Sequence, residues 1–360
     1  MLRIDWPMRW APWLTAPQSL DGWRERLETT AVQEAARIAQ LQGVAGVGFI
    51  GAAGRGNPWP GSDVDLLVMV DGCVAATTGV LREYERQRNV QLLADRVPIE
   101  VEAANWVLSR EELAGLCSPE GEVQVRAFCE HPRPDMVLKA CGGRALLDDT
   151  GMVGRYIEGC NHTVFTDRFV HGRLHRALRA EEPRVTAAEE LIASGELQAA
   201  SLELLRAGHG LSTGIYDMWR RIPESIMRAV TKLLLHAEHV GDASTGELFL
   251  EVCRLGEKRT WDRFACTPAG ARLERDVVLA TRRGAGEQVG PLDATRDLLH
   301  AVSLLDAWRR KAPAEAYPPW TGVTNDREEV LDQRKAAREL LRRLERVRHD
   351  LRGTLAGAPT

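Results

Sequence analysis

The hydrophobic pattern of the chain changes character near residue 150. Before that point, short runs rich in Val, Ile and Leu are bounded by turn-forming residues, which is typical of strands. These runs predict strands at residues 44–51, 63–70 and 97–107, and a last edge strand with its turn at 144–152. Amphipathic periodicity predicts helices between and before them, at 20–42 and 77–89.

Beyond residue 150 the strand pattern disappears and only helical periodicity remains. Helices are predicted at 154–180, 186–207, 212–240, 245–256, 268–283, 293–311 and 326–353. Two segments of turn-forming composition, 284–291 and 311–322, interrupt this series. The pattern therefore predicts two domains, residues 1–150 and residues 151–360.

Composition narrows the class of protein. The chain has 360 residues, of which 44% are hydrophobic and 27% charged, with a formal net charge of −4. This is globular composition and argues against nucleic acid or an anionic membrane as the general partner. The start of the chain lacks the pattern of a signal peptide, and the seven cysteines show no CxxC spacing. We expect a cytoplasmic protein with reduced thiols; the pattern leaves its oligomeric state open.

Two aspartates stand out in the second predicted strand. Asp63 and Asp65 alternate with hydrophobic residues in "SDVDLLVMV", so their side chains emerge on the same face of the strand. Two neighbouring carboxylates repel each other unless a cation neutralises them. The pair therefore indicates a metal site; the alternative is the solvated end of a strand.

Three neighbouring features favour the metal site. The segment "GAAGRG" follows the first strand, and its glycines allow backbone N–H groups to approach a phosphate closely. Ser62 precedes the first aspartate, and Glu100 is a further carboxylate among apolar residues of the third predicted strand. Three carboxylates beside such a turn suit phosphoryl chemistry with Mg²⁺, which prefers oxygen ligands. Glu102 lies two residues after Glu100 on the same face, and we interpret it as a solvated strand end.

These residues resemble the signature of the DNA polymerase β-like nucleotidyltransferase superfamily, in particular its antibiotic-modifying, aminoglycoside nucleotidyltransferase-like branch. The signature is a strand, a Gly-Ser-x-Ala-Arg-Gly turn, a Ser-Asp-x-Asp strand and a third acid on a later strand. The matching positions are Gly51, Arg55, Gly56, Ser62, Asp63, Asp65 and Glu100. The resemblance covers residues 44–107. It implies an α+β fold, in which a nucleotidyltransferase domain with a mixed sheet and flanking helices precedes an all-α C-terminal domain.

The resemblance also implies a reaction. Asp63, Asp65 and Glu100 would bind one or two Mg²⁺ ions and act in catalysis, with Glu100 accepting a proton from the acceptor hydroxyl. A nucleoside triphosphate, with ATP preferred, would donate a nucleoside monophosphate to a hydroxyl of a small, antibiotic-like molecule and release pyrophosphate. The residues implied in binding the nucleotide are Gly51, Ala52, Arg55, Gly56 and Ser62. Lys232 of the helical domain is a further candidate, which comes from its position on a helix stripe and not from the resemblance.

Two positions depart from the family pattern. Ala52 stands where the family has a serine that holds phosphate, and Gly54 replaces a small alanine. The missing hydroxyl removes one hydrogen bond, worth about 0.5–1.5 kcal/mol net. A noncatalytic nucleotide-binding or regulatory module therefore remains an alternative, as does a transferase that modifies a protein or a tRNA.

Other patterns carry weaker expectations. The stripe of Asp167, His171 and His175 suits a metal site or, as we favour, a polar helix face. Arg228, Lys232 and His236 form a stripe that could reach a triphosphate or face solvent. The final helix is basic on one side, which suits RNA contact or ordinary packing. Four early tryptophans suggest an arm that packs on a partner or on the core: Trp6, Trp10, Trp13 and Trp23.

Overall fold

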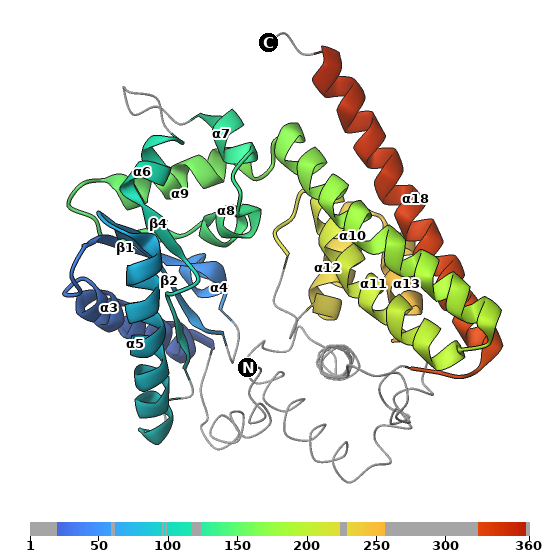
Figure 1. Cartoon of the computed structure of the whole chain (residues 1–360), viewed down its shortest axis with the longest axis horizontal. Helices are drawn as coiled ribbons and strands as arrows, with labels where there is room; N and C mark the ends of the chain where they lie inside the picture. The colour runs from blue at the N-terminus through green and yellow to red at the C-terminus, as the bar shows by residue number, and fades with distance from the viewer. Residues whose placement is uncertain are drawn as a thin grey trace. The chain divides into compact units, whose positions relative to one another are not determined.

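A computed structural model describes most of the chain (Figure 1). The described residues are 20–58, 62–95, 97, 99–116, 124–223, 229–255 and 323–357. They form two compact units, which divide after Thr166, and each unit is described by itself. The boundary predicted after residue 150 precedes a helix that packs on the sheet of the first unit.

The first unit is built on a small mixed sheet. Its strands are β1 (Val44–Ile50), β2 (Val64–Val70), β3 (Val101–Glu102), β4 (Val107–Ser109) and β5 (Arg144–Leu147). The order is β3-β2-β1-β5, and β4 also pairs with β2. β1 is antiparallel to β2 and β5, whereas β3 and β4 run parallel to β2. The strand predicted at 97–107 is thus two short strands along one edge of β2.

One face of this sheet carries the main core of the unit. Helices α3 (Leu20–Ile38) and α5 (Val74–Ala94) contribute buried side chains to a cluster with alternate residues of β1 and β2. The members from the two strands are Val47, Phe49, Val64, Leu66, Val68 and Val70. Because strand side chains alternate, the residues between them face the opposite side of the sheet.

The opposite face is covered by helices that approach the backbone closely. A Cβ added to Gly46 or Gly48 of β1 would lie 2.8 or 2.7 Å from Val153 of α9 (Met152–Thr163). Glycine at both positions therefore allows α9 to pack directly on the strand. Three further helices, which the hydrophobic pattern did not predict, lie between β4 and β5 in the chain: α6 (Arg110–Ala114), α7 (Val125–Cys129) and α8 (Pro134–Ala140).

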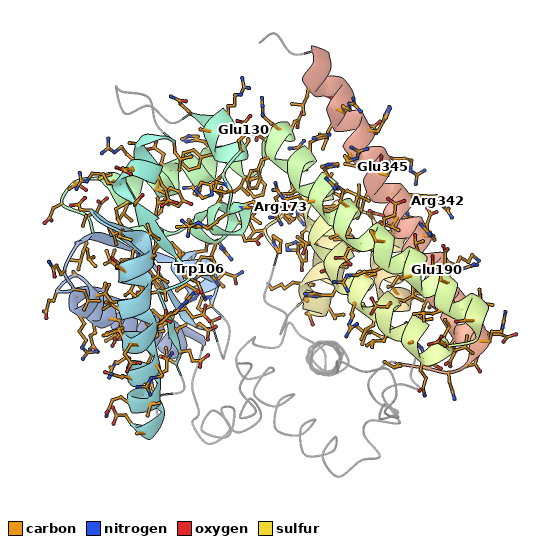
Figure 2. All side chains as sticks on the ribbon, in the orientation of Figure 1. Trp106, Glu130, Arg173, Glu190, Arg342 and Glu345 are labelled. Atoms are coloured by element: carbon orange, nitrogen blue, oxygen red, sulfur yellow. The ribbon has the colours of Figure 1, made fainter. Side chains whose placement is uncertain are left out.

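The second unit is helical in its described part. Its helices are α10 (Asp167–Ser194), α11 (Leu197–Met218), α12 (Ala229–Val240), α13 (Ala243–Val252) and α18 (Arg327–Gly357). A buried ion pair joins α10 to α11, because Arg173 Nε lies 2.8 and 3.0 Å from the two carboxylate oxygens of Asp217. Figure 2 labels Arg173 on α10. Gly214 of α11 lies against Leu344 of α18, where an added Cβ would be 2.8 Å from the leucine side chain.

Several predicted helix boundaries are wrong. The break predicted between 180 and 186 lies inside α10, which continues through Pro183, and the break predicted between 207 and 212 lies inside α11. The final helix agrees closely with its prediction at 326–353. The helices predicted at 268–283 and 293–311, and the arm with Trp6, Trp10 and Trp13, lie outside the described residues.

Two further observations concern the whole described chain. Within the described ranges, no helix has the length and apolar character needed to cross a lipid bilayer. Five cysteines are free thiols: Cys73, Cys129, Cys141, Cys160 and Cys253. Cys117 and Cys266 lie outside the described residues.

Candidate active site

Asp65 is a buried carboxylate near the start of β2. The residue is only 3% exposed, and its Oδ2 lies 2.8 Å from the Nζ of Lys139. Its Oδ1 is buried with no hydrogen-bond partner in the described part of the chain. Burial raises the pKa of Asp65 to about 6, although Lys139 lowers it in part and the neighbouring Glu102 raises it further. Asp65 therefore combines burial, one cationic partner and one oxygen without a partner among the described residues.

Gly51 makes room for the Asp65 carboxylate. Gly51 follows β1 directly and begins the short helix α4 (Gly51–Gly54) with a left-handed φ of +73°. A Cβ at this position would lie 2.1 Å from Asp65 Oδ2 and 3.0 Å from the Cε of Lys139. Only glycine fits this place without strain, because the backbone conformation and the contact both exclude a side chain.

Lys139 reaches the site from α8. Its side chain is 32% exposed, and its ammonium lies 5.3 Å from the centre of the Trp106 ring, within the range of a cation–π contact. The Trp106 indole favours the charged form of Asp65, but its Nε1 falls short of hydrogen-bond geometry with the carboxylate. Lys139 is therefore the counter-ion that the structure places at Oδ2 of Asp65.

The strand register brings two further acids to this face. Val64 pairs with Val101 and Asp65 with Glu102, so Glu102 lies directly beside Asp65. One position earlier, the backbone N–H of Val64 donates to the carbonyl of Glu100 at 2.7 Å, which sets Asp63 alongside Glu100. Asp65 and Glu102 therefore share one face of β2 and β3, and alternation would put Asp63 and Glu100, which precede these strands, on the same side. Glu102 is the one whose charge raises the pKa of Asp65.

The break between β3 and β4 is held by side chains of α5. Glu85 Oε1 accepts hydrogen bonds from the backbone N–H groups of Ala103 and Ala104, the second at 2.6 Å. Asn89 exchanges two hydrogen bonds with the backbone of Val101, at 2.9 and 3.2 Å. The backbone groups between β3 and β4 would bond to a neighbouring strand if the strand were continuous, and here they bond to Glu85 and Asn89 instead. These bonds hold the segment that leads to Trp106 at the edge of the site.

The rest of the glycine-rich turn has a structural role. The aliphatic part of the Arg55 side chain packs against the loop after α8. A Cβ added at Gly142 in that loop would lie only 2.7 Å from the Arg55 Cγ. Gly56 has a left-handed φ of +74°, and nothing lies within 4 Å of an added Cβ. Ala52 and Ser62 are half-buried. The turn therefore links β1 to α8, the helix that supplies Lys139.

The carboxylates of Asp63 and Asp65 fit a hard cation such as Mg²⁺. Among the described residues, no three side chains of the types His, Cys, Asp and Glu are grouped so as to hold a metal ion. However, Mg²⁺ keeps most of its water and is commonly held by one or two carboxylates together with substrate phosphates. Asp63 is half-buried, and Asp65 retains an unpartnered buried oxygen. These two carboxylates are therefore suitable ligands.

Other predicted site residues lie elsewhere. Lys232 is half-buried in α12 of the second unit, so its role at the nucleotide stays a prediction. His236 makes an edge-on ring contact with Tyr216, with centroids 5.7 Å apart, and Arg228 lies outside the described residues. Asp167 pairs with Arg220, which provides a structural role for the first member of the Asp167, His171 and His175 stripe.

Sequence reasoning missed Lys139 and Trp106. The pattern did not predict α8, in which Lys139 follows the buried residues Val137 and Leu138. A single lysine after such a buried run, just before a Cys-Gly-Gly turn, is the signal that could have drawn attention to it. Searches of family models, curated proteins and solved structures gave no match to this chain.

Proposed function

We propose that this protein is a Mg²⁺-dependent nucleotidyltransferase that moves a nucleoside monophosphate from a nucleoside triphosphate to a hydroxyl group of a small molecule. The observation that carries the proposal is the acidic face of β2 beside Gly51. There, among the residues that the structure describes, the buried carboxylate of Asp65 has one unpartnered oxygen and Lys139 as its counter-ion. ATP is the preferred donor, and the resemblance to antibiotic-modifying enzymes suggests the class of acceptor.

In this proposal Asp63 and Asp65 hold the cation, and the turn from Gly51 to Gly56 lies along the triphosphate. Mg²⁺ would supply charge neutralisation for the phosphates and for the pyrophosphate that departs. Lys139 leaves Asp65 when the cation binds, and its charge then becomes available to a phosphate oxygen. Lys232, which the sequence pattern suggested for the nucleotide, belongs to the second unit.

A carboxylate of β3 accepts the proton of the acceptor. The hydroxyl oxygen forms a bond to the α-phosphorus, the bond from that phosphorus to the bridging oxygen breaks, and pyrophosphate leaves with the electron pair. The register favours Glu102 for this part because it lies beside Asp65, whereas the sequence pattern favoured Glu100. Both residues are half-buried, so either can meet a bound acceptor.

A noncatalytic nucleotide-binding module is the second candidate. The observation in its favour is Ala52, which lacks the hydroxyl that the resembling family uses to hold phosphate. Binding alone does not need a proton acceptor on β3, so this alternative predicts that neither Glu100 nor Glu102 matters beyond stability.

Thermal melts with and without MgATP test the proposal. Asp63→Asn and Asp65→Asn should each remove the MgATP-induced rise in Tm, because each removes a ligand charge. Asp71→Asn is the matched control, since Asp71 follows the same strand but is exposed and pairs with Arg110. Equal shifts in all four proteins would contradict the metal assignment.

Release of pyrophosphate separates the two candidates. The full chain is incubated with MgATP and a panel of hydroxylated small molecules, including aminoglycosides, and pyrophosphate is measured. Release that depends on one acceptor and on Asp65 supports the transferase. A MgATP-induced rise in Tm without release over the whole panel favours the binding module.

A further inference from the structure

The second unit contains a hollow between α10 and α18. Its volume is about 740 Å³, which lies within the ~300–1,000 Å³ of ordinary small-molecule sites. Leu178 and Leu341, both nearly buried, provide its apolar lining. Its charged lining residues are His175, Arg179, Glu182, Arg338, Glu339, Arg342, Glu345, Arg346 and Arg348.

The lining has more positive than negative charge. Five of the charged residues are arginines and three are glutamates, so two positive charges are in excess even with His175 neutral. Glu339 pairs with two of the lining arginines, Arg342 at 2.6 Å and Arg346 at 3.6 Å. One carboxylate cannot satisfy all the N–H groups of two guanidinium groups, so donors remain for a ligand.

Arg179 is a further available donor. It is exposed on α10 and makes no ion pair with any residue that the structure describes. Arg338 makes a half-buried two-point pair with Glu189, whereas the pairs of Arg342, Arg346 and Arg348 are more exposed. Exposed ion pairs contribute only about 0–1 kcal/mol. An anion with better geometry can therefore replace them at little cost.

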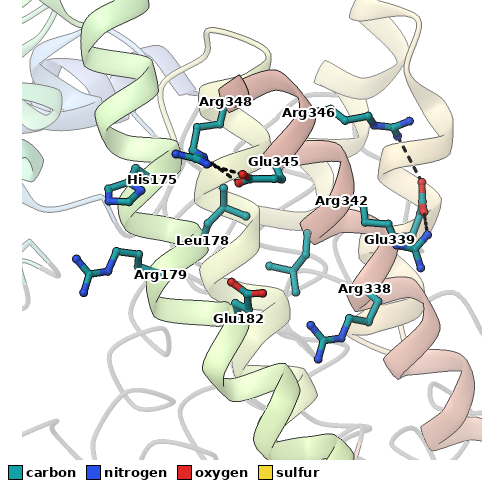
Figure 3. Close-up of a pocket in the computed structure, with 11 residues that line it drawn as sticks. His175, Leu178, Arg179, Glu182, Arg338, Glu339, Arg342, Glu345, Arg346 and Arg348 are labelled. Carbon is teal, nitrogen blue, oxygen red and sulfur yellow. Dashed lines mark hydrogen bonds and ion pairs between the residues drawn. The ribbon is translucent and has the colours of Figure 1, made fainter. Parts of the chain in front are cut away.

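The charges are distributed across the hollow in a definite way (Figure 3). His175 and Arg179 lie along the side formed by α10, and Arg342 and Arg346 extend from α18 toward Glu339, away from α10. Glu182 and Glu345 lie between the two helices, close to Leu178, and Glu345 accepts two hydrogen bonds from Arg348. Both helices thus carry positive charge around a centre that offers apolar contact and two carboxylates.

His171, next to this region on α10, responds to the same positive charge. Its pKa is lowered first by burial and then by the charges of Arg348, His175 and Arg352. A bound anion would relieve this mutual repulsion.

We propose that the hollow binds a small molecule with two phosphate groups joined by a hydroxylated middle, of which a sugar bisphosphate is the simplest example. Each phosphate meets guanidinium groups on one side, where the planar fork of arginine matches phosphate oxygens. The hydroxyls of the middle donate to Glu182 and Glu345, and its C–H face lies on the two leucines. This inference does not depend on the proposed transferase, because all of its residues belong to the second unit.

Size and charge distinguish this ligand from a nucleic acid. The lining residues of α18 run from Arg338 to Arg348, which is about 15 Å along a helix. A continuous phosphate backbone laid along that path would bring its charges against the central carboxylates Glu182 and Glu345. Two separate phosphates avoid this repulsion, whereas a polyphosphate chain and an RNA strand do not.

Calorimetric titration of the full chain without divalent cations tests the proposal. Fructose 1,6-bisphosphate should bind, and the neutral sugar should not. Arg179→Gln and Arg346→Gln should each weaken binding of the bisphosphate by about tenfold, because each removes a charged hydrogen-bond donor. Arg327→Gln should have no effect, since Arg327 is exposed on the same helix but does not line the hollow.

Glu182→Gln gives a sharper test because its effect should differ in sign between two anions. The variant should bind the bisphosphate more weakly, because the hydroxyls of the ligand lose a charged acceptor. It should bind inorganic tripolyphosphate more tightly, because the repulsion between Glu182 and the phosphates is removed. Thermal melts of every variant verify the fold. Equal bisphosphate affinity in the wild type, Arg179→Gln and Arg346→Gln would overturn the proposal. So would tighter binding of a short single-stranded RNA than of the bisphosphate.

Discussion

The ammonium of Lys139 lies 2.8 Å from the carboxylate of Asp65, so a buried acid of the candidate site already has a counter-ion from its own chain. The two residues are far apart in sequence and meet because α8 packs at the end of β1 and β2. Leaving Asp65 charged without any partner would be costly at 3% exposure. Lys139 therefore offsets the charge of Asp65 whenever no other cation is bound.

Substitution of Lys139 should affect metal affinity directly. Lys139→Met removes a positive charge that competes with a divalent cation, so we expect Mn²⁺ alone to bind roughly tenfold more tightly. Lys139→Arg keeps the charge and is the matched control. Titration of Mn²⁺ by electron paramagnetic resonance, without nucleotide, measures the effect. Identical Mn²⁺ affinities in the three proteins would show that Lys139 does not compete for this position.

The third carboxylate can be identified by comparing Glu102→Gln with Glu100→Gln. If Glu102 accepts the proton, Glu102→Gln should reduce transfer by about 10²–10⁴ and leave the MgATP-induced rise in Tm unchanged. It should also lower the pKa of Asp65, because the charge of Glu102 raises that pKa. Carboxyl resonances followed by NMR over pH report this second effect. Loss of transfer in Glu100→Gln alone would return the role to Glu100.

The sequence predicted the acidic pair but not its surroundings. Alternation along β2 is a local property, so the shared face of Asp63 and Asp65 follows from their spacing alone. Which acid of β3 lies beside Asp65 depends on the register between two strands, and this is set by tertiary contacts. Single-sequence patterns carry no register, and so Glu102 was interpreted as a strand end.

Helix boundaries show a similar limit in the second unit. The hydrophobic pattern predicted a break between 180 and 186, yet α10 continues through Pro183 because its buried side chains pack on both sides of that position. Tertiary packing therefore outweighed the local preference of proline. Lys139 was missed for a different reason. Its helix, α8, has only seven residues, which is too short to show a recognisable helical periodicity.

Gly51 provides a test of close packing around Asp65. Gly51→Ala should destabilise the fold by more than the ~1–2 kcal/mol of a left-handed non-glycine residue, because the new Cβ also meets the carboxylate. Gly56→Ala is the control, since Gly56 has nearly the same φ and open space around it. Urea denaturation of both variants gives the difference. Equal losses would mean that the carboxylate moves aside without cost.

Glu181 should make the stability of the helical unit depend on pH. Burial raises its pKa to about 7, and Arg184 offsets only part of this effect. Between the ordinary value of 4.5 and this value the folded state binds more protons than the unfolded state, so Glu181 lowers stability as the pH rises through that range. Glu181→Gln should therefore gain roughly 1–3 kcal/mol over the wild type at pH 8 and little at pH 4.

The measurement for Glu181 is the difference in unfolding free energy between variant and wild type at several pH values. Burial lowers the pKa of His209 to about 4, so His209 makes the folded state more stable as the pH rises, opposite to Glu181. This contribution is the same in both proteins and cancels in the difference. Glu190→Gln, an exposed change on the same helix, should follow the wild type at every pH. A Glu181→Gln difference that does not vary with pH would contradict this account.

The pairing of β1 with β2 has a consequence for the order of folding. These strands are joined by a short connection, whereas α8 and β5 come much later in the chain, from residue 134 onward. Closing a short loop costs less entropy, so the β1–β2 pair can form while Asp65 is still hydrated. Lys139 arrives only when α8 docks. We therefore expect that dehydration of Asp65 and docking of α8 occur together in a late step, which makes the candidate site one of the last parts of the unit to mature.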